Sequence, residues 1–278
     1  MISFPNCKIN LGLNILGKRE DGYHNIQTIF YPLPLRDALE ITVQKNRDAI
    51  SAVQFTSSGL SIPGNSESNL CVKAYALLKN DFPRLPPIIV HLLKAIPIGA
   101  GLGGGSADGA FALVALNKKF ELGLTTQQLL DYAARLGSDC PFFILNQPCI
   151  AFGRGEQLTP IDVDLGSFKL VLVNPGIHID TGWAFSQLDH FNRASKLPLA
   201  EVIKLPVQNW REHLTNDFEI PVFKYHPELA EIRDSLYANA AVFCCMSGSG
   251  SSIFGLFPKN VNPILNYPPG YLVKQINL

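Results

Sequence analysis

Residues 97–108 read PIGAGLGGGSAD, and this glycine-rich stretch constrains the fold more than any other part of the chain. Five of its residues are glycine, and a segment with helical periodicity follows directly. Glycine accepts backbone conformations that other residues avoid, and it lets main-chain N–H groups approach a bound group closely. Because the loop leads into the start of a helix, the stretch predicts a binding site for phosphate.

The bulk composition narrows the class of protein. The chain has 278 residues, of which 47% are hydrophobic and 17% are charged, as expected for a globular protein of one large or two smaller domains. Lys+Arg and Asp+Glu both number 23, so no basic excess points to nucleic acid. The sequence has no apolar run of about 18 residues, which predicts no membrane helix, and no secretory leader is expected at its start.

The cysteines and histidines give no metal signature. The six cysteines form no C-x-x-C pair, and the six histidines show no H-x-x-x-H spacing. We therefore expect free, buried thiols in a reducing cytoplasm, and no zinc site.

Periodicity predicts an α+β fold. Strands are expected at residues 7–15, 27–30, 39–44, 88–93, 150–152, 168–173, 241–246 and 252–257. Helices are expected at residues 70–79, 106–119, 125–136, 181–193 and 228–238, and a short one begins near Pro141. Ser106 is the expected N-cap of the helix after the glycine loop, and Gly109 is expected to loosen that helix slightly. A boundary near residue 153 would divide the chain into domains 1–153 and 154–278.

Three interpretations of the glycine loop compete before any resemblance is considered. The spacing G-x-G-x-x-G fits a dinucleotide-binding loop by letter, but no strand precedes Glu121, the acidic residue at about the required distance. A Walker A loop requires a lysine before its Ser/Thr, and Gly105 stands there instead. A flexible linker fits poorly between a strand and a helix, so a third kind of phosphate loop is favoured.

The loop resembles the P-x-x-x-G-L-G-S/G-S/G-S-A/S motif of the GHMP small-molecule kinases. Other stretches match motifs of that family in the same order along the whole chain: residues 5–13 (PNCKINLGL), 19–24 (REDGYH), 136–143 (LGSDCPFF), 174–177 (NPGI) with Thr181, 216–219 (NDFE) and 248–252 (GSGSS). The resemblance implies a two-domain α+β architecture. It would combine an N-terminal ATP-binding domain containing a left-handed βαβ unit with a C-terminal, ferredoxin-like substrate domain.

The resemblance also implies ATP and Mg²⁺ as cofactors. The residues expected to bind ATP are Pro97, Gly99, Gly101, Leu102, Gly103, Gly104, Gly105 and Ser106, with Asn69 and Lys94 near the adenine. Ser106 has an equally good explanation as a plain N-cap, and Asn69 as the N-cap of the helix that begins at Leu70. No carboxylate stands out as a Mg²⁺ ligand beyond Asp139 and Asp108, so the metal ligands stay unassigned.

Asp139 and Lys8 are the expected catalytic pair. The resemblance implies that Asp139 accepts the proton of the attacking hydroxyl, although local sequence alone favours it as a helix cap at Pro141. Lys8 lies on an apolar strand, where an ammonium needs a site or a counter-charge, and it would keep Asp139 ionised. A surface lysine on an edge strand is the alternative. Asn10 lies on the same strand face and would bond the substrate or orient Asp139.

The substrate is expected to be a small molecule with a cytidine diphosphate group. In the resembled kinases an aromatic pair encloses the cytosine, and Tyr23, His24 and Phe185 match that pocket. His24 would hydrogen-bond the base edge, Thr181 would add a polar contact, and Phe185 could instead be an ordinary core residue. Residues 178–180 (HID) replace the small residues or proline often found there in the family, which leaves the shape of the pocket open.

Two other functions remain as alternatives. One is a GHMP kinase for another alcohol, such as homoserine or mevalonate, which would lack the DGYH motif. The other is a non-catalytic nucleotide-binding regulator, which intact Lys8 and Asp139 disfavour. As partners we expect no nucleic acid and no membrane, and the chain is expected to be a monomer or a weak homodimer.

Overall fold

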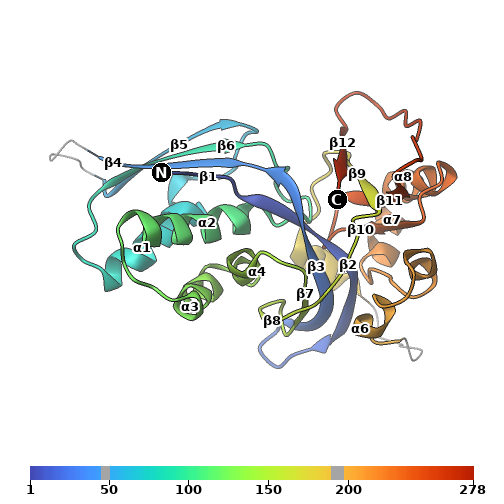
Figure 1. The fold of residues 1–278 in the computed structure, drawn as a ribbon, viewed down its shortest axis with the longest axis horizontal. Helices are drawn as coiled ribbons and strands as arrows, with labels where there is room; N and C mark the ends of the chain where they lie inside the picture. The colour runs from blue at the N-terminus through green and yellow to red at the C-terminus, as the bar shows by residue number, and fades with distance from the viewer. Residues whose placement is uncertain (45–50, 189–196) are drawn as a thin grey trace. The chain divides into compact units, whose positions relative to one another are not determined.

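The computed structural model describes residues 1–44, 51–188 and 197–278, which form two compact units (Figure 1). Unit 1 comprises Met1–Cys7, Pro34–Ile98 and Gly103–Gln147. Unit 2 comprises Lys8–Leu33, Gly99–Leu102 and Pro148–Leu278. This division differs from a single cut near residue 153, because two long N-terminal strands pair within unit 2 and four residues of the glycine loop pack there.

Unit 1 is a four-stranded sheet covered by helices. Its strands β1 (Ile2–Ser3), β4 (Ala38–Val43), β6 (Ile88–Lys94) and β5 (Val53–Gly59) lie in the order β1-β4-β6-β5. The strands β5 and β6 are parallel, and η1 (Ser66–Ser68) and α1 (Leu70–Asp81) connect them, so this segment is a βαβ unit. The sequence analysis did not predict β5, in which only Val53 and Phe55 are partly buried and the other residues are exposed.

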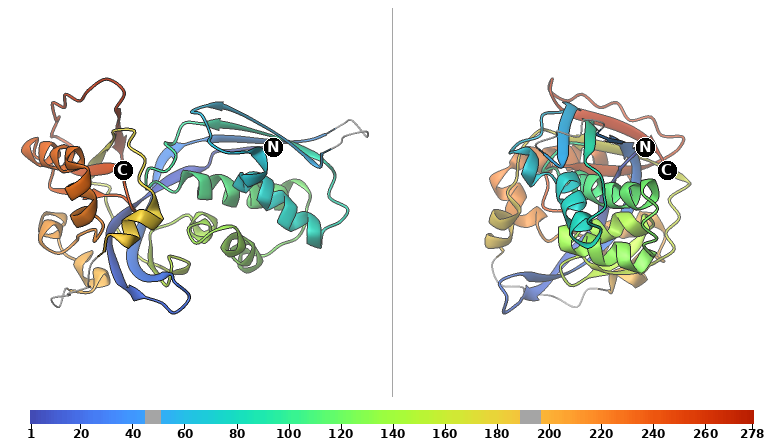
Figure 2. Two further views of the ribbon diagram at one scale, coloured as in Figure 1. Left: turned by 180° about the vertical axis from the view of Figure 1, so that it is seen from behind. Right: turned by 90° about the vertical axis from the view of Figure 1, so that its left-hand side faces the viewer.

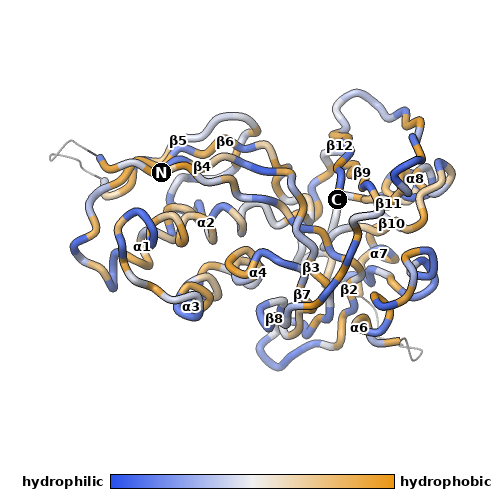
Figure 3. Tube along the Cα trace, viewed as in Figure 1, coloured by the Kyte–Doolittle hydropathy of each residue, from blue (hydrophilic) through white to orange (hydrophobic). Residues whose placement is uncertain are grey.

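The helices of unit 1 gather on one side of its sheet (Figures 1 and 2). They are α1, α2 (Gly104–Lys119), α3 (Thr126–Leu136) and α4 (Cys140–Leu145). A capping box at Thr125 begins α3, with both of its hydrogen bonds between Thr125 and Gln128 present, and Gly137 follows the last turn of the helix. The short helix α4 has the sequence CPFFIL and is coloured hydrophobic in Figure 3, in keeping with four buried side chains.

Gly109 has a packing role that the sequence did not reveal. A Cβ atom added at Gly109 would lie 2.8 Å from the Cβ atom of Leu70, the first residue of α1. The missing side chain therefore lets α1 and α2 approach each other closely, a role separate from the slight loosening of α2 that the sequence predicts.

Unit 2 contains two further sheets. The first has the order β2-β3-β7-β8, with β2 (Asn6–Lys18), β3 (His24–Arg36), β7 (Cys149–Phe152) and β8 (Gln157–Pro160). The second has the order β10-β11-β9-β12 and is antiparallel throughout, with β9 (Phe168–Asn174), β10 (Phe243–Met246), β11 (Ile253–Pro258) and β12 (Leu272–Asn277). Figure 3 shows how hydrophobic and hydrophilic residues are distributed along these strands.

The helices of unit 2 fall between β9 and β10. They are α5 (Thr181–Ser186), α6 (Leu199–Val202), η2 (Val207–Glu212), α7 (Glu219–Tyr225) and α8 (Pro227–Ala238). No helix lies between β11 and β12 in the described chain, so the ferredoxin-like pattern β-α-β-β-α-β lacks its second helix. The helix expected at residues 181–193 ends at Ser186, and residues 189–193 lie outside the described ranges.

Candidate active site

The glycine loop has a backbone that only glycine adopts readily. Gly99, Gly101 and Gly103 have φ values of 64°, 75° and 68°, in the left-handed region. Helix α2 then begins at Gly104, with Gly103 as its N-cap and no side chain capping the first turn. The prediction of Ser106 as the N-cap was wrong, because the left-handed Gly103 starts the helix earlier. The first N–H groups of α2 therefore point to no capping side chain, as an anion site requires.

Part of this loop packs against a second glycine turn within unit 2. A Cβ atom on Gly101 would lie 1.8 Å from the carbonyl oxygen of Ser247, and one on Gly248 would lie 3.1 Å from the Cα atom of Gly101. The Ser247 hydroxyl donates to the Gly101 carbonyl at 2.7 Å, and the Ser252 N–H donates to the Ala100 carbonyl at 3.2 Å. The two turns thus touch through their backbones, which explains the glycine at both positions.

The second glycine turn is itself held by Asn216 and Glu219. The Asn216 Nδ2 donates to the carbonyls of Met246 at 2.8 Å and Gly248 at 2.7 Å, and Asn216 is 1% exposed. The Glu219 Oε1 accepts the Met246 N–H at 2.7 Å, and burial raises the pKa of Glu219. The motif at residues 216–219 matched the family, but its role in fixing this turn could not be read from the sequence.

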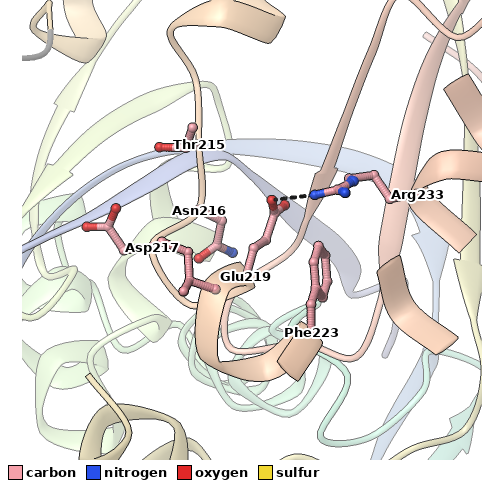
Figure 4. A pocket seen from close by; sticks show the side chains of 7 residues that line it. Thr215, Asn216, Asp217, Glu219, Phe223 and Arg233 are labelled. Atoms are coloured by element: carbon pink, nitrogen blue, oxygen red, sulfur yellow. Dashed lines mark ion pairs between the residues drawn. The ribbon is translucent and has the colours of Figure 1, made fainter. Parts of the chain in front are cut away.

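A pocket of about 230 Å³ adjoins Asn216 and Glu219, and Figure 4 shows the side chains that line it. Asn216 and Glu219 line it together with Phe223 and Arg233, and an Arg233 nitrogen lies 3.8 Å from Glu219 Oε2. The Asp217 Oδ2 accepts the N–H of Ile15 at 2.7 Å, which ties this segment to β2. The residues around the pocket therefore have structural partners in the fold.

Lys8 and Asn10 share one face of β2, as the sequence predicted. The Lys8 Nζ donates to the Asn10 Oδ1 at 2.6 Å and lies 4.8 Å from the centre of the Phe30 ring. The Asn10 Nδ2 donates to the Thr28 Oγ1 at 2.8 Å, and both residues are almost fully buried. Lys8 is 3% exposed, so the alternative of a surface lysine is wrong.

Two residues that sequence reasoning missed complete this network. The Thr28 hydroxyl donates to the carbonyl of Gly12 at 2.6 Å, so it fixes the amide of Asn10 against β2. The Ser247 hydroxyl accepts the Asn10 N–H at 3.3 Å while it donates to Gly101. Ser247 therefore links the strand of Lys8 to the glycine loop. A serine in a small-residue turn carries no signal of such a contact.

Asp139 belongs to unit 1, whereas Lys8 belongs to unit 2, and their pairing stays a prediction. Asp139 occupies the N-cap position of α4, but its side chain makes no capping hydrogen bond. Its backbone is already helical, with φ −86° and ψ −15°, which does not aim the carboxylate at the first N–H groups. The plain capping role that local sequence favoured is therefore wrong.

Lys94 and Asn69 have structural partners within unit 1. The Lys94 ammonium is 3% exposed and donates to Asp37 Oδ2 at 2.5 Å and to Asp108 Oδ2 at 2.7 Å. The Asn69 side chain accepts the Cys71 N–H at 2.9 Å and caps α1. Two carboxylates enclose the Lys94 ammonium, which disfavours its side chain as an adenine contact. Asp108 is 3% exposed and is paired with that ammonium, which disfavours it as a Mg²⁺ ligand.

Burial and neighbouring charges shift the pKa values of Lys94 and Asp108. Burial lowers the pKa of Lys94, but Asp108 and Asp37 outweigh it and leave that pKa above its usual value. Burial raises the pKa of Asp108 to about 7; Lys94 opposes this rise and Asp37 adds to it. One cation thus faces two carboxyl groups, one of which releases its proton near neutral pH.

Two of the predicted substrate residues, His24 and Phe185, are in direct contact in unit 2. The rings of His24 and Phe185 are stacked, with centroids 4.5 Å apart and an interplanar angle of 12°. That spacing leaves no room for a base between them. The Tyr23 ring is 55% exposed, and the guanidinium of Arg154 lies 4.6 Å from its centre. Burial lowers the pKa of His24, which favours the neutral imidazole that both donates and accepts hydrogen bonds.

Residues 178–180 each have a definable place. Ile179 is 3% exposed in the core of unit 2, and the Asp180 side chain accepts the Trp183 N–H at 2.7 Å and caps α5. His178 lies beside Gly99, where an added Cβ would be 2.7 Å from its Nδ1. The Thr181 hydroxyl is 2.9 Å from that of Ser249 in the second glycine turn.

All six cysteines are free and buried, as predicted. The described residues contain no cluster of three or more His, Cys, Asp or Glu side chains suited to a metal ion. None of the helices in the described chain has the length and apolar character needed to cross a membrane.

Comparison with known proteins identifies the family. The family model described as "GHMP kinases N terminal domain" matches residues 69–153, and "GHMP kinases C terminal" matches residues 199–267. Together with the relatives described next, these matches show that the chain belongs to the GHMP kinases.

Several curated relatives carry one name. A 4-diphosphocytidyl-2-C-methyl-D-erythritol kinase of Bacteroides fragilis (strain YCH46) is 52% identical over 92% of this chain and 92% of its own. A kinase of the same name from Parabacteroides distasonis is 49% identical over 93% of this chain and 92% of its own.

Solved structures agree with the fold. A crystal structure of 4-(cytidine 5'-diphospho)-2C-methyl-D-erythritol kinase is 32% identical, with a TM-score of 0.78 and coverage of 92% of this chain and 90% of that one. The mevalonate kinase of Methanococcus jannaschii is 13% identical, with a TM-score of 0.67 and coverage of 94% and 92%, and shares the fold alone.

Proposed function

We propose that this chain is an ATP-dependent kinase acting on 4-diphosphocytidyl-2-C-methyl-D-erythritol. It would transfer the γ-phosphoryl group of ATP to the 2-hydroxyl of that alcohol, a step of non-mevalonate isoprenoid precursor biosynthesis. The similarity to kinases of this name over more than nine-tenths of the chain supports the substrate. The observation that carries the chemistry is the buried Lys8 ammonium, which is held by Asn10 on the strand that Ser247 links to the glycine loop.

ATP fits the glycine loop. Its left-handed glycines and the uncapped first turn of α2 offer main-chain N–H groups to the phosphates, and Gly105 is open, with no atom within 4 Å of an added Cβ. Pro97, Leu102 and Ser106 complete the proposed ATP-binding stretch, and Asn69 contributes as the cap of α1.

Mg²⁺ fits a chain that lacks a carboxylate cluster in its described part. Magnesium usually keeps several waters and is held by substrate phosphates with one or two side chains. When bound with ATP it neutralises negative charge on the phosphates. Asp139 is the remaining candidate among the carboxylates considered above.

The protein's own groups then perform the transfer. Asp139 accepts the proton of the substrate hydroxyl as that oxygen attacks the γ-phosphorus, and ADP leaves. Lys8 stabilises the negative charge that develops on the transferred group. Positioning by Asn10 and Thr28 supplies the orientation on which such reactions depend.

Recognition of the substrate is assigned to Tyr23, His24, Phe185 and Thr181. Because His24 and Phe185 stack at 4.5 Å, a cytosine would replace the imidazole against the Phe185 face, and His24 would turn to bond the base edge. This exchange would keep an aromatic contact in both states.

One assay tests the function. The purified protein is given ATP, Mg²⁺ and, in separate reactions, the cytidine diphosphate alcohol, homoserine or mevalonate, and ADP release is measured. We expect turnover with the cytidine compound alone. The Asp139→Asn variant and a reaction without alcohol give the background. Turnover with homoserine or mevalonate instead would assign another alcohol, and no turnover with any would favour a nucleotide-binding regulator.

A further inference from the structure

The two ends of the glycine loop are joined by a buried ion pair in unit 1. Lys94 is the last residue of β6, just before the loop, and Asp108 is the fifth residue of α2, just after it. Their side chains meet at 2.7 Å, and both residues are 3% exposed. This contact therefore closes the base of the loop.

Asp37 fixes the incoming end of the loop. Its Oδ1 accepts the N–H groups of Ala95 at 2.6 Å and Ile96 at 2.8 Å, while its Oδ2 accepts the Lys94 ammonium. Asp37 lies between β3 and β4 and is 1% exposed. A single carboxylate thus orients the backbone that leads into the loop and the lysine that spans its base.

Gly104 shows how tightly this triad packs against the start of α2. A Cβ atom at Gly104 would lie 2.8 Å from Cγ2 of Ile96 and 3.0 Å from Nζ of Lys94. The first residue of the helix therefore rests directly on the lysine. The ammonium therefore lies beside the residue whose N–H group is among the first of α2.

We propose that Asp37, Lys94 and Asp108 are positioning residues that hold the glycine loop in its nucleotide-binding form. This inference rests on the proposed ATP-binding role of the loop. None of the three side chains needs to touch ATP, since each acts through the backbone at one end of the loop. Burying three ionisable groups is costly. The ion pairs among them and the backbone N–H groups bonded to Asp37 offset part of that cost, while Asp108 Oδ1 has no hydrogen-bond partner in the described chain.

The Asp108→Ala variant is the main test. It breaks the tie at the outgoing end of the loop but leaves Lys94 paired with Asp37, so the buried charges still balance. We expect the Kd of ADP to rise about 10-fold, with faster amide exchange at residues 99–105 in the absence of nucleotide. Asp108→Asn keeps an acceptor for the ammonium and should stay within about twofold of the parent protein.

Asn117→Ala is the matched control on the same helix. The Asn117 side chain donates to the Leu124 carbonyl at 3.1 Å and accepts the Leu124 N–H at 3.0 Å, at the far end of α2. Its loss removes a comparable number of hydrogen bonds and should lower Tm without changing the Kd of ADP. A merely structural role for Asp108 predicts that both variants behave alike, and that result would overturn the proposal.

Gly104→Ala provides a second variant should Asp108→Ala fail to fold. It keeps all three charges but displaces the ammonium, and it should also weaken ADP binding and speed exchange in the loop. Unchanged exchange at residues 99–105 in both variants would contradict the inference. If the parent protein binds ADP but turns over no alcohol, the proposed reaction fails while these comparisons still decide the role of the triad.

Discussion

The glycine loop is held in two different ways in the two units. In unit 2, residues Gly99–Leu102 are fixed by neutral hydrogen bonds from Ser247 and by backbone contact with Gly248. In unit 1, the flanking residues are fixed by the buried charges of Asp37, Lys94 and Asp108. We call the first the neutral arrangement: it depends on the absence of side chains, and no ionisable side chain among the described residues takes part in the contact between the two turns. We call the second the charged arrangement: because it depends on ionisable groups, we expect it to respond to pH.

Gly101→Ala is expected to lower the free energy of unfolding more than any other variant, because the new side chain would clash at the contact between the two glycine turns. The new Cβ would lie 1.8 Å from the Ser247 carbonyl oxygen, at a residue whose φ is 75°. We expect a loss of about 3 kcal/mol or more in the free energy of unfolding, since a backbone cannot yield as a flexible side chain does. Urea denaturation measures it.

Gly123→Ala separates the clash from the backbone strain. Gly123 has a φ of 72°, close to that of Gly101, but an added Cβ meets no atom within 4 Å. Its loss should be limited to the strain of about 1–2 kcal/mol. Equal losses in the two variants would show that the contact between the glycine turns contributes nothing.

The same contrast explains how far the sequence could predict the site. The glycine motif, the strand face shared by Lys8 and Asn10, and the capping box at Thr125 are local patterns, and the structure contains them. The pairing of Lys94 with Asp37 could not be predicted from the sequence, because the two residues are 57 positions apart and no pattern around Asp37 indicates that it is buried. Sequence reasoning assigned Lys94 to ATP, whereas long-range packing assigns it to carboxylates.

The stacking of His24 on Phe185 could not be predicted from the sequence for a related reason. Both residues were predicted for one pocket, but the order of the rings depends on the tertiary structure. Ser106 was misplaced as a cap because the left-handed Gly103 starts the helix at Gly104, earlier than the sequence pattern indicates. Local propensity identifies the elements, and side-chain partners far along the chain decide their details.

Asn216→Ala is expected to cause the next largest loss in the free energy of unfolding. It tests the hydrogen bonds that hold the second glycine turn in place. It removes the donor to the carbonyls of Met246 and Gly248 in a site that is 1% exposed. Buried acceptors left without a partner should lower the free energy of unfolding by about 2 kcal/mol. The loss should be the same at low and high salt, because no charge is involved.

Asn239→Ala serves as the comparison for this effect. Its side chain donates to the Ser235 carbonyl at 3.0 Å and accepts the Ile264 N–H at 3.2 Å, at the C-terminal end of α8. A loss below about 1 kcal/mol is expected there. If the Asn216 variant lost no more than this, the second glycine turn would not depend on its amide.

The smallest expected effect is a change of the free energy of unfolding with pH, which we expect from Asp108 in the charged arrangement. Burial raises the pKa of Asp108 to about 7, above its value in the unfolded chain. The folded state therefore binds the proton more tightly, and this group's contribution to stability is lost as pH rises through about 7. The amide of the Asp108→Asn variant does not titrate, so this variant should gain stability relative to the parent between about pH 6.3 and 8, by about 1 kcal/mol.

Urea denaturation of both proteins at each pH measures this difference, and other titrating groups largely cancel in the subtraction. The groups facing Asp108 are Lys94 and Asp37, with Cys71 of α1 nearby; burial raises the pKa of that thiol well above this range. The same subtraction with Asn216→Ala should be flat with pH. A flat difference for Asp108→Asn as well would mean that Asp108 is ionised throughout, and that Lys94 balances both carboxylates rather than one.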